Sequence, residues 1–140
     1  MSDARVQELE QAGWAIEPGD GYRNHIGPLW SRQDREHKRF GMLTDSRHAN
    51  RFGVVHGGLL LSLADESLGI TSLIANGGRR QVTIQLSSQF ISSAQVGEFV
   101  ESHTEVLRRT RTMIFVRGLL QVGDRTILSA EGIWKVLDER

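Results

Sequence analysis

One carboxylate stands out within a mostly apolar segment of the chain. Asp65 lies about two turns into residues 56–70, whose leucines, isoleucine and alanine are typical of a buried helix. At about 100° per residue, a helix places Asp65 on one narrow stripe with the small residues Gly58, Ser62, Gly69 and Ser72. Small neighbours leave room for a ligand, so the pattern predicts an active site with Asp65 as nucleophile or general base. The alternative is a carboxylate capped by Ser62 or paired with an arginine.

Two glycines begin the same helix. Gly57 and Gly58 follow His56 directly. The first N–H groups of a helix lack an internal acceptor and lie at the positive end of its dipole, and glycine lets a ligand approach them closely. We therefore expect the Gly57 N–H to stabilise a polarised carbonyl oxygen, as in an oxyanion hole. The alternative is a glycine pair that only turns the chain or packs against a neighbouring element.

Two polar side chains precede these glycines. Asn50 could donate to a carbonyl or position a water molecule, although asparagine is also a common turn residue. His56 could cap the helix, orient the loop or bond to substrate. The other four of the five histidines share no metal-ligand spacing with His56, so we expect no metal site.

The elements that must position these groups differ in their hydrophobic period. Residues 3–12 indicate a short helix, residues 40–44 a first strand, and the glycines at 77–78 the end of the buried helix. Residues 14–30 are expected to be irregular, and residues 32–39 a solvated charged surface. Alternation then predicts four strands in an antiparallel meander, over residues 82–90, 99–109, 112–122 and 126–137. The economical arrangement is an α+β fold, with a curved antiparallel sheet wrapped around one long central helix.

Composition limits the classes of function. The 140 residues indicate one domain. A net charge of zero, from 17 basic and 17 acidic residues, argues against nucleic acid or an anionic membrane as a partner. The absence of cysteine excludes disulfides and cysteine nucleophiles. The first ten residues are polar and we find no apolar run of about 18 residues, so we expect a cytoplasmic protein.

The motifs together resemble the signature of one family. Residues 50–58, with Asn50, Gly53 and then His56-Gly57-Gly58, continue into Leu63-Ala64-Asp65. This order and spacing resemble the PaaI-like hotdog-fold acyl-CoA thioesterases, and residues 82–90 are similar to the strand that follows the helix in that family. The resemblance covers roughly residues 40–137. It implies a single hotdog domain over residues 40–140, preceded by an N-terminal extension over residues 1–39 with a short helix and loop.

The resemblance also implies a homodimer, or a homotetramer built as a dimer of dimers, with the site at the dimer interface. Asn50 and Gly57 of one chain would face Asp65 and Thr83 of the other. Gly57 would polarise the thioester carbonyl, Asn50 would place the carbonyl or the water, and Asp65 would attack or activate water. The catalytic candidates are Asp65, Asn50, Gly57 and His56. The substrate-binding candidates are Thr83, Gly58, Arg79, Arg80 and Arg108, the arginines for the phosphates of coenzyme A.

The activity predicted from the resemblance is hydrolysis of an acyl-CoA thioester to free acid and CoA, without a cofactor. One rival is a hotdog hydratase or dehydratase that pairs a catalytic histidine with an acid, as His56 and Asp65 could superficially do. The chain lacks the prolines expected to frame such a histidine. Another rival is a module that binds acyl-CoA without reacting, which would not need Asp65. The acyl group, and CoA against an acyl carrier protein, stay open on sequence alone.

Overall fold

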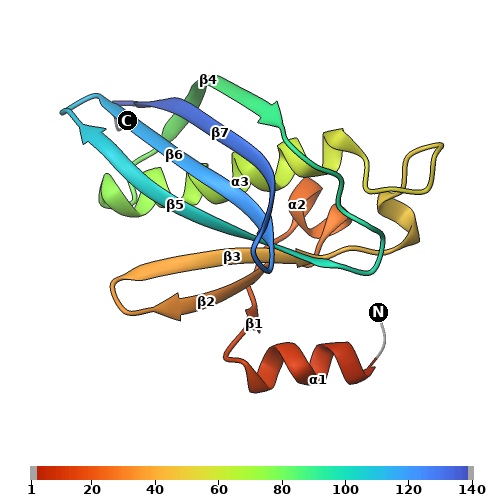
Figure 1. The fold of residues 1–140 in the computed structure, drawn as a ribbon. Coiled ribbons are helices and arrows are strands. Elements are labelled where there is room, and N and C mark those ends of the chain that lie inside the picture. Colours follow the sequence, from red (N-terminus) through yellow and green to blue (C-terminus); the bar gives the residue numbers. More distant parts are fainter. Residues whose placement is uncertain (1–2, 139–140) are drawn as a thin grey trace.

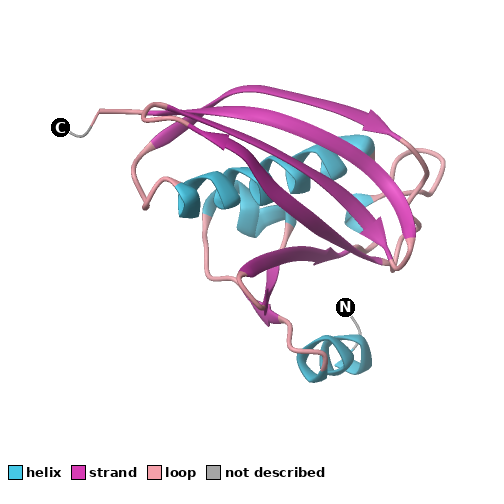
Figure 2. Cartoon of the chain, turned by 60° about the vertical axis from the view of Figure 1, so that its left-hand side comes forward, coloured by secondary structure: helices cyan, strands magenta, loops and turns pink. Residues whose placement is uncertain are grey.

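The apolar segment after His56 forms α3 (Gly57–Ala75), which lies across the concave face of a curved antiparallel sheet in the computed structural model (Figures 1 and 2). The structure describes residues 3–138. α3 ends as predicted, because Gly77 and Gly78 follow with φ of 81° and 85°, a conformation that favours glycine. The predicted α+β class, a sheet wrapped around one long helix, is confirmed.

The sheet has seven strands in the order β1-β2-β3-β5-β6-β7-β4. Their bounds are β1 Ala15–Ile16, β2 Trp30–Asp34, β3 His37–Leu43, β4 Gln81–Phe90, β5 Phe99–Arg109, β6 Met113–Val122 and β7 Arg125–Val136. The four strands predicted after the helix are confirmed, but the meander is wrong for β4. This strand pairs with β7 rather than β5, so it forms one edge of the sheet. Alternation reports which face of a strand is buried but not which strand lies beside it.

The segment before β3 is more ordered than its sequence suggests. Helix α1 (Asp3–Gln11) matches the prediction, but residues 14–39 also contain β1, the helix α2 (Gly21–Ile26) and a β2–β3 hairpin. Asp34, Arg35 and Glu36 are exposed, as expected of a solvated charged surface, but the expectation of an irregular stretch is wrong. Its polar side chains pair across elements: Glu17 accepts hydrogen bonds from Ser31 Oγ at 2.6 Å and Lys38 Nζ at 2.8 Å.

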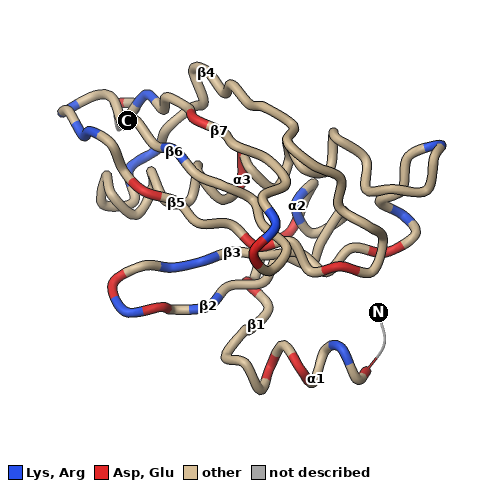
Figure 3. Tube along the Cα trace, viewed as in Figure 1, with Lys and Arg blue, Asp and Glu red and all other residues tan. Residues whose placement is uncertain are grey.

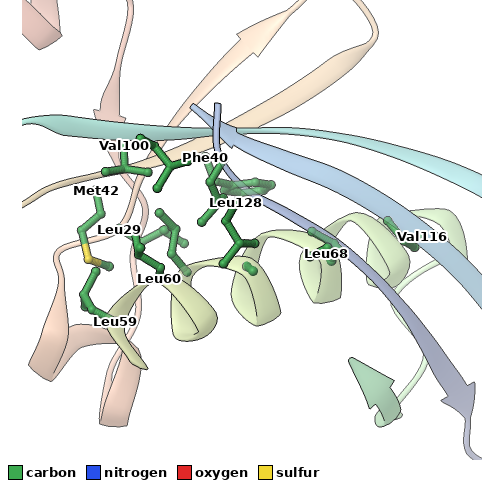
Figure 4. Close-up of a cluster of buried hydrophobic side chains, with 14 of the residues drawn as sticks. Leu29, Phe40, Met42, Leu59, Leu60, Leu68, Val100, Val116 and Leu128 are labelled. Atoms are coloured by element: carbon green, nitrogen blue, oxygen red, sulfur yellow. The ribbon is translucent and has the colours of Figure 1, made fainter. Parts of the chain in front are cut away.

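The main core lies between α3 and the sheet (Figure 4). Each fully buried aliphatic side chain there contributes about 1.5–3 kcal/mol through the hydrophobic effect. The core includes Leu29, Phe40, Met42, Leu60, Leu63, Leu68, Val100, Val116 and Leu128. A second cluster (Leu9, Trp14, Trp30 and Leu43) seats α1 against the β2–β3 region of the sheet. The first cluster packs α3 against the sheet, which forms the frame for the site.

The remaining face of α3 is open in the single chain. Ser62, Asp65 and Gly69 are only half-buried, so the expectation of a helix buried on all sides is wrong for the isolated protomer. By length and composition alone, α3 is also long and apolar enough to cross a bilayer, contrary to the expectation that no segment would be. Packing against the sheet on one side accounts for much of this apolar composition.

Candidate active site

His56 caps the first turn of α3 and thereby selects which N–H group stays available. Its backbone is extended (φ −64°, ψ 136°), and its Nδ1 accepts the N–H of Gly58 at 2.8 Å. Nδ1 therefore carries no proton in this arrangement, which places the ring proton on Nε2. The Gly57 N–H makes no hydrogen bond within residues 3–138. One free donor thus points out of the positive end of a 19-residue helix.

Asn50 organises the loop that leads to this donor. Its Oδ1 accepts the backbone N–H groups of Phe52 at 2.8 Å and Val54 at 3.3 Å, and its own N–H donates to Val54 O at 2.7 Å. Gly53 supplies the positive φ of 83° that the tight turn requires. The loop is thus fixed by the amide oxygen, while the Asn50 amide nitrogen has no acceptor in the described chain and stays free to donate.

Asp65, in the middle of α3, contacts Thr83 of the edge strand β4. Thr83 Oγ1, on β4, donates to Asp65 Oδ1 at 3.2 Å. A bulge in β4 between Thr83 and Gln85 shifts the strand register next to this contact, and such bulges re-aim side chains at functional sites. Both residues line a cavity of about 200 Å³ with Gly69, Gln81 and Trp134. The predicted pairing of Asp65 with Thr83 is present in the structure.

Glu66 borders the same cavity but is engaged elsewhere. Its carboxylate lies 3.8 Å from Arg23 on α2. Burial raises the pKa of Glu66, and the nearby charge of Asp65 raises it further, against the opposing effect of Arg23. The ion pair with Arg23 gives Glu66 a structural role between α2 and α3. The identity of the partner carried no sequence signal.

The two halves of the candidate site are far apart within one chain. Eight residues of α3 separate Gly57 from Asp65, which at the helical rise is about 12 Å along the axis. A carbonyl bound at Gly57 is therefore out of reach of Asp65 of the same protomer. Asn50 and Gly57 form one half of the site, and Asp65 and Thr83 form the other.

A basic cluster surrounds the C-terminal end of α3, where Lys and Arg gather near the β5–β6 connection (Figure 3). Arg79, Arg109 and Arg111 line a cavity of about 170 Å³ there, and Arg109 Nη1 donates to Ala75 O at 2.6 Å. Arg80 and Arg108 flank these residues in sequence but do not line the cavity. In the described part of the chain, none of the five arginines forms an ion pair. This leaves their charges available to an anion.

Sequence reasoning missed one contact on the open face of α3. Tyr22 of α2 reaches Ser62, with 2.8 Å between the two hydroxyl oxygens. Forty residues separate the two in sequence, and no local pattern connects them. Over residues 3–138, no group of three or more His, Cys, Asp or Glu side chains is arranged to hold a metal ion.

Comparison with known proteins defines the class to which this fold and site belong. The family model described as the thioesterase superfamily matches residues 52–128. A Pseudomonas aeruginosa protein whose name describes it as an esterase is 35% identical over 111 residues, which are 78% of this chain and 83% of that protein. The chain therefore belongs to the thioesterase superfamily, whose general activity is thioester hydrolysis.

Further relatives agree with this assignment. Acyl-coenzyme A thioesterase 13 of Mus musculus is 26% identical over 74 residues, and the match spans only 53% of each chain. A mutant of the phenylacetic acid degradation protein PaaI from Thermus thermophilus has a TM-score of 0.68 at 15% identity, covering 94% of this chain and 99% of that one. A Bacillus halodurans protein solved with CoA has a TM-score of 0.74 at 16% identity, covering 96% and 84%. The predicted resemblance to the PaaI-like hotdog thioesterases is confirmed.

Proposed function

We propose that this chain is an acyl-CoA thioesterase that acts as a homodimer, with each active site built from two protomers. The observation that carries the proposal is the free Gly57 N–H at the start of α3, beside a Gly58 N–H that His56 already occupies. A lone backbone donor at a helix N-terminus is suited to a thioester oxygen that gains negative charge as the carbonyl is attacked. The free amide nitrogen of Asn50 is a second donor on the same loop.

Asp65 supplies the reacting carboxylate in this proposal. Thr83 donates to Oδ1 and so holds the carboxylate in one orientation, which leaves Oδ2 for the chemistry. As a general base, Asp65 takes a proton from water while the oxygen of that water attacks the carbonyl. As a nucleophile, it forms a mixed anhydride that water then cleaves. In both routes the C–S bond breaks, the CoA thiolate takes up a proton and the free acid leaves.

A second copy of the chain brings the two halves together. β4 is an edge strand with unpaired backbone groups, and its apolar side chains Val82, Ile84 and Phe90 are 44%, 51% and 55% exposed. An exposed apolar edge of this length is a template for another strand. Pairing of β4 with β4 of a partner continues the sheet and covers the open face of α3. Asp65 and Thr83 of one protomer then approach Asn50 and Gly57 of the other.

In this proposal, the basic cluster binds the phosphates of coenzyme A. Ten residues of α3 separate Asp65 from Ala75, which is about 15 Å along the helix axis. The phosphates of CoA are separated from the thioester by the extended pantetheine arm, and arginine is well suited to phosphate. Support comes from the name of the mouse relative and from the CoA bound to the Bacillus halodurans protein. The hydratase alternative fits less well, because His56 serves as a helix cap whose Nδ1 already accepts the Gly58 N–H.

Thiol release from a panel of acyl-CoAs tests the proposed activity. Asp65→Asn keeps the size of the side chain and its contact with Thr83, and we expect kcat to fall about 10²-fold or more. Unchanged turnover in this variant would remove Asp65 from the mechanism. For the CoA assignment, Arg109→Gln should raise KM for acyl-CoA but leave KM for the matching acyl-pantetheine thioester unchanged. Equal effects on both substrates would show that Arg109 does not bind the nucleotide.

A further inference from the structure

The short helix α2 packs against the open face of α3 (Figure 1). Ser62 donates its hydroxyl hydrogen to Gly58 O at 2.9 Å, so its oxygen must accept the hydrogen of Tyr22 across their 2.8 Å contact. Tyr22 is thereby tied to α3 at Ser62, less than one helical turn before Asp65. Its ring remains 64% exposed in the single chain. The hydroxyl of Tyr22 is therefore fixed, while its ring is exposed and can contact a ligand.

The helix that carries Tyr22 is held rigidly in place. His48 is buried, and its Nδ1 accepts the Asp45 N–H, so its Nε2 donates to Ile26 O at 2.7 Å. Arg47 donates to His25 O at 3.0 Å and to Gly27 O at 2.7 Å. The backbone carbonyl of His48 also accepts the N–H of His56 at 2.7 Å. One buried histidine thus fixes α2 and the carbonyl-binding loop to each other.

The order of groups along α3 indicates which part of the substrate lies near Tyr22. The basic cluster lies beyond the C-terminal end of α3, so the CoA arm runs from Asp65 in that direction. The acyl group then leaves the reacting carbonyl toward the N-terminal end of α3. Ser62, which holds Tyr22, lies three residues before Asp65, less than one helical turn away. On the proposed function, the tyrosine ring would therefore lie across the path of the acyl group.

We propose that Tyr22 is a specificity-determining residue, whose ring closes the acyl end of the site and limits the length of the acyl group. This inference rests on the proposed function. It predicts that removing the ring opens the site to longer chains, whereas removing only the hydroxyl does not, because α2 is held independently by His48 and Arg47. A hydrophobic pocket commonly discriminates about tenfold or more per methylene group, so the effect should be large.

The test compares kcat/KM over a series of saturated acyl-CoAs for the full-length wild type, Tyr22→Ala and Tyr22→Phe. We expect Tyr22→Ala to raise the ratio of long-chain to short-chain kcat/KM by about tenfold. Tyr22→Phe should stay within about threefold of wild type. A chain-length profile that is unchanged in Tyr22→Ala, or that falls in parallel for all substrates, would overturn the inference. An equal shift in Tyr22→Phe would show that the effect comes from the hydrogen bond, and it would also overturn the inference that the ring limits acyl length.

A binding measurement separates failure of this inference from failure of the proposed function. In an Asp65→Asn background, dissociation constants for the same acyl-CoAs are measured by calorimetry with and without Tyr22→Ala. The inference expects the ring deletion to tighten long-chain binding selectively, even if the wild type hydrolyses nothing. No detectable binding of any acyl-CoA would overturn both proposals. Binding whose chain-length dependence is the same with and without Tyr22→Ala would overturn only the inference about Tyr22.

Discussion

The free N–H of Gly57 can be deleted without removing the helix that presents it. Gly57→Pro replaces this hydrogen with a ring carbon, and proline is well tolerated at the first position of a helix. The residue before a proline must be extended, and His56 already is, with ψ of 136°. Gly57→Ala is the matched control, because it adds a Cβ atom but keeps the N–H. In both variants the new Cβ lies about 3.0 Å from the Phe90 ring, which is half-exposed and able to shift.

The size of the effect follows from how few donors the site contains. Loss of one oxyanion donor costs about 10²–10³ in kcat, or about 2.7–4 kcal/mol. The Gly58 N–H cannot substitute, since His56 accepts it. The Asn50 amide remains as a second donor, so we expect Gly57→Pro to lose about 10²-fold in kcat, near the lower limit of that range. Gly57→Ala should lose less than about tenfold, the cost of moving one partly exposed ring.

The assay is thiol release at saturating acyl-CoA, with thermal unfolding and dimer mass as controls for the fold. Both variants should have melting temperatures close to that of the wild type, because neither removes a hydrogen bond of the folded chain. Equal kcat values in the proline and alanine variants would refute the reasoning, since the N–H would then carry no charge in the transition state. A loss of dimer in the proline variant alone would also count against it, because the proposed role of this N–H is chemical.

The remaining predictions concern the second half of the site and the acid stability of the fold. Thr83→Val keeps the shape of the strand residue but removes the hydrogen bond to Asp65; kcat should fall about tenfold with an unchanged melting temperature, and unchanged kcat would contradict a positioning role. Burial alone raises the pKa of Glu17, but hydrogen bonds from Lys38 and Ser31 outweigh it and lower that pKa below the usual 4.5. The stabilisation from Glu17 is therefore complete above the unfolded pKa and is lost as the pH falls through the folded value. In urea unfolding, the free energy of unfolding should decrease less between pH 6 and pH 3 in Glu17→Gln than in the wild type. Equal decreases in both proteins would exclude the Glu17 interactions as a source of the acid destabilisation.

Much of the frame could be predicted from hydrophobic period alone. The alternation over residues 82–137 predicted four strands, and the apolar segment before Asn76 predicted α3. Period could not predict that β4 pairs with β7, because neighbours within a sheet are set by tertiary packing. The β2–β3 hairpin was also missed. Its charged residues read as a solvated surface, whereas Arg39 is only 15% exposed and pairs with Glu101 on β5.

The candidate site was predictable where local sequence determines geometry. The glycines after His56 indicated a helix start with a free donor, and the structure narrows this donor to Gly57 because the His56 ring takes the Gly58 N–H. The contact between Asp65 and Thr83 was expected only through the family resemblance. The position of Tyr22 could not be predicted, since it depends on where α2 docks. Sequence motifs identify reacting groups, while substrate selection depends on long-range packing.

Complementation between two inactive variants tests the central claim most directly. Asp65→Asn and Gly57→Pro chains, carrying different affinity tags, are co-expressed, and the heterodimer is purified through both tags. If each site takes Gly57 from one chain and Asp65 from the other, the heterodimer contains one intact site and one doubly altered site. The expected kcat per dimer is about half that of the wild type, far above either parent homodimer. A heterodimer as inactive as its parents would contradict an active site shared between the two protomers.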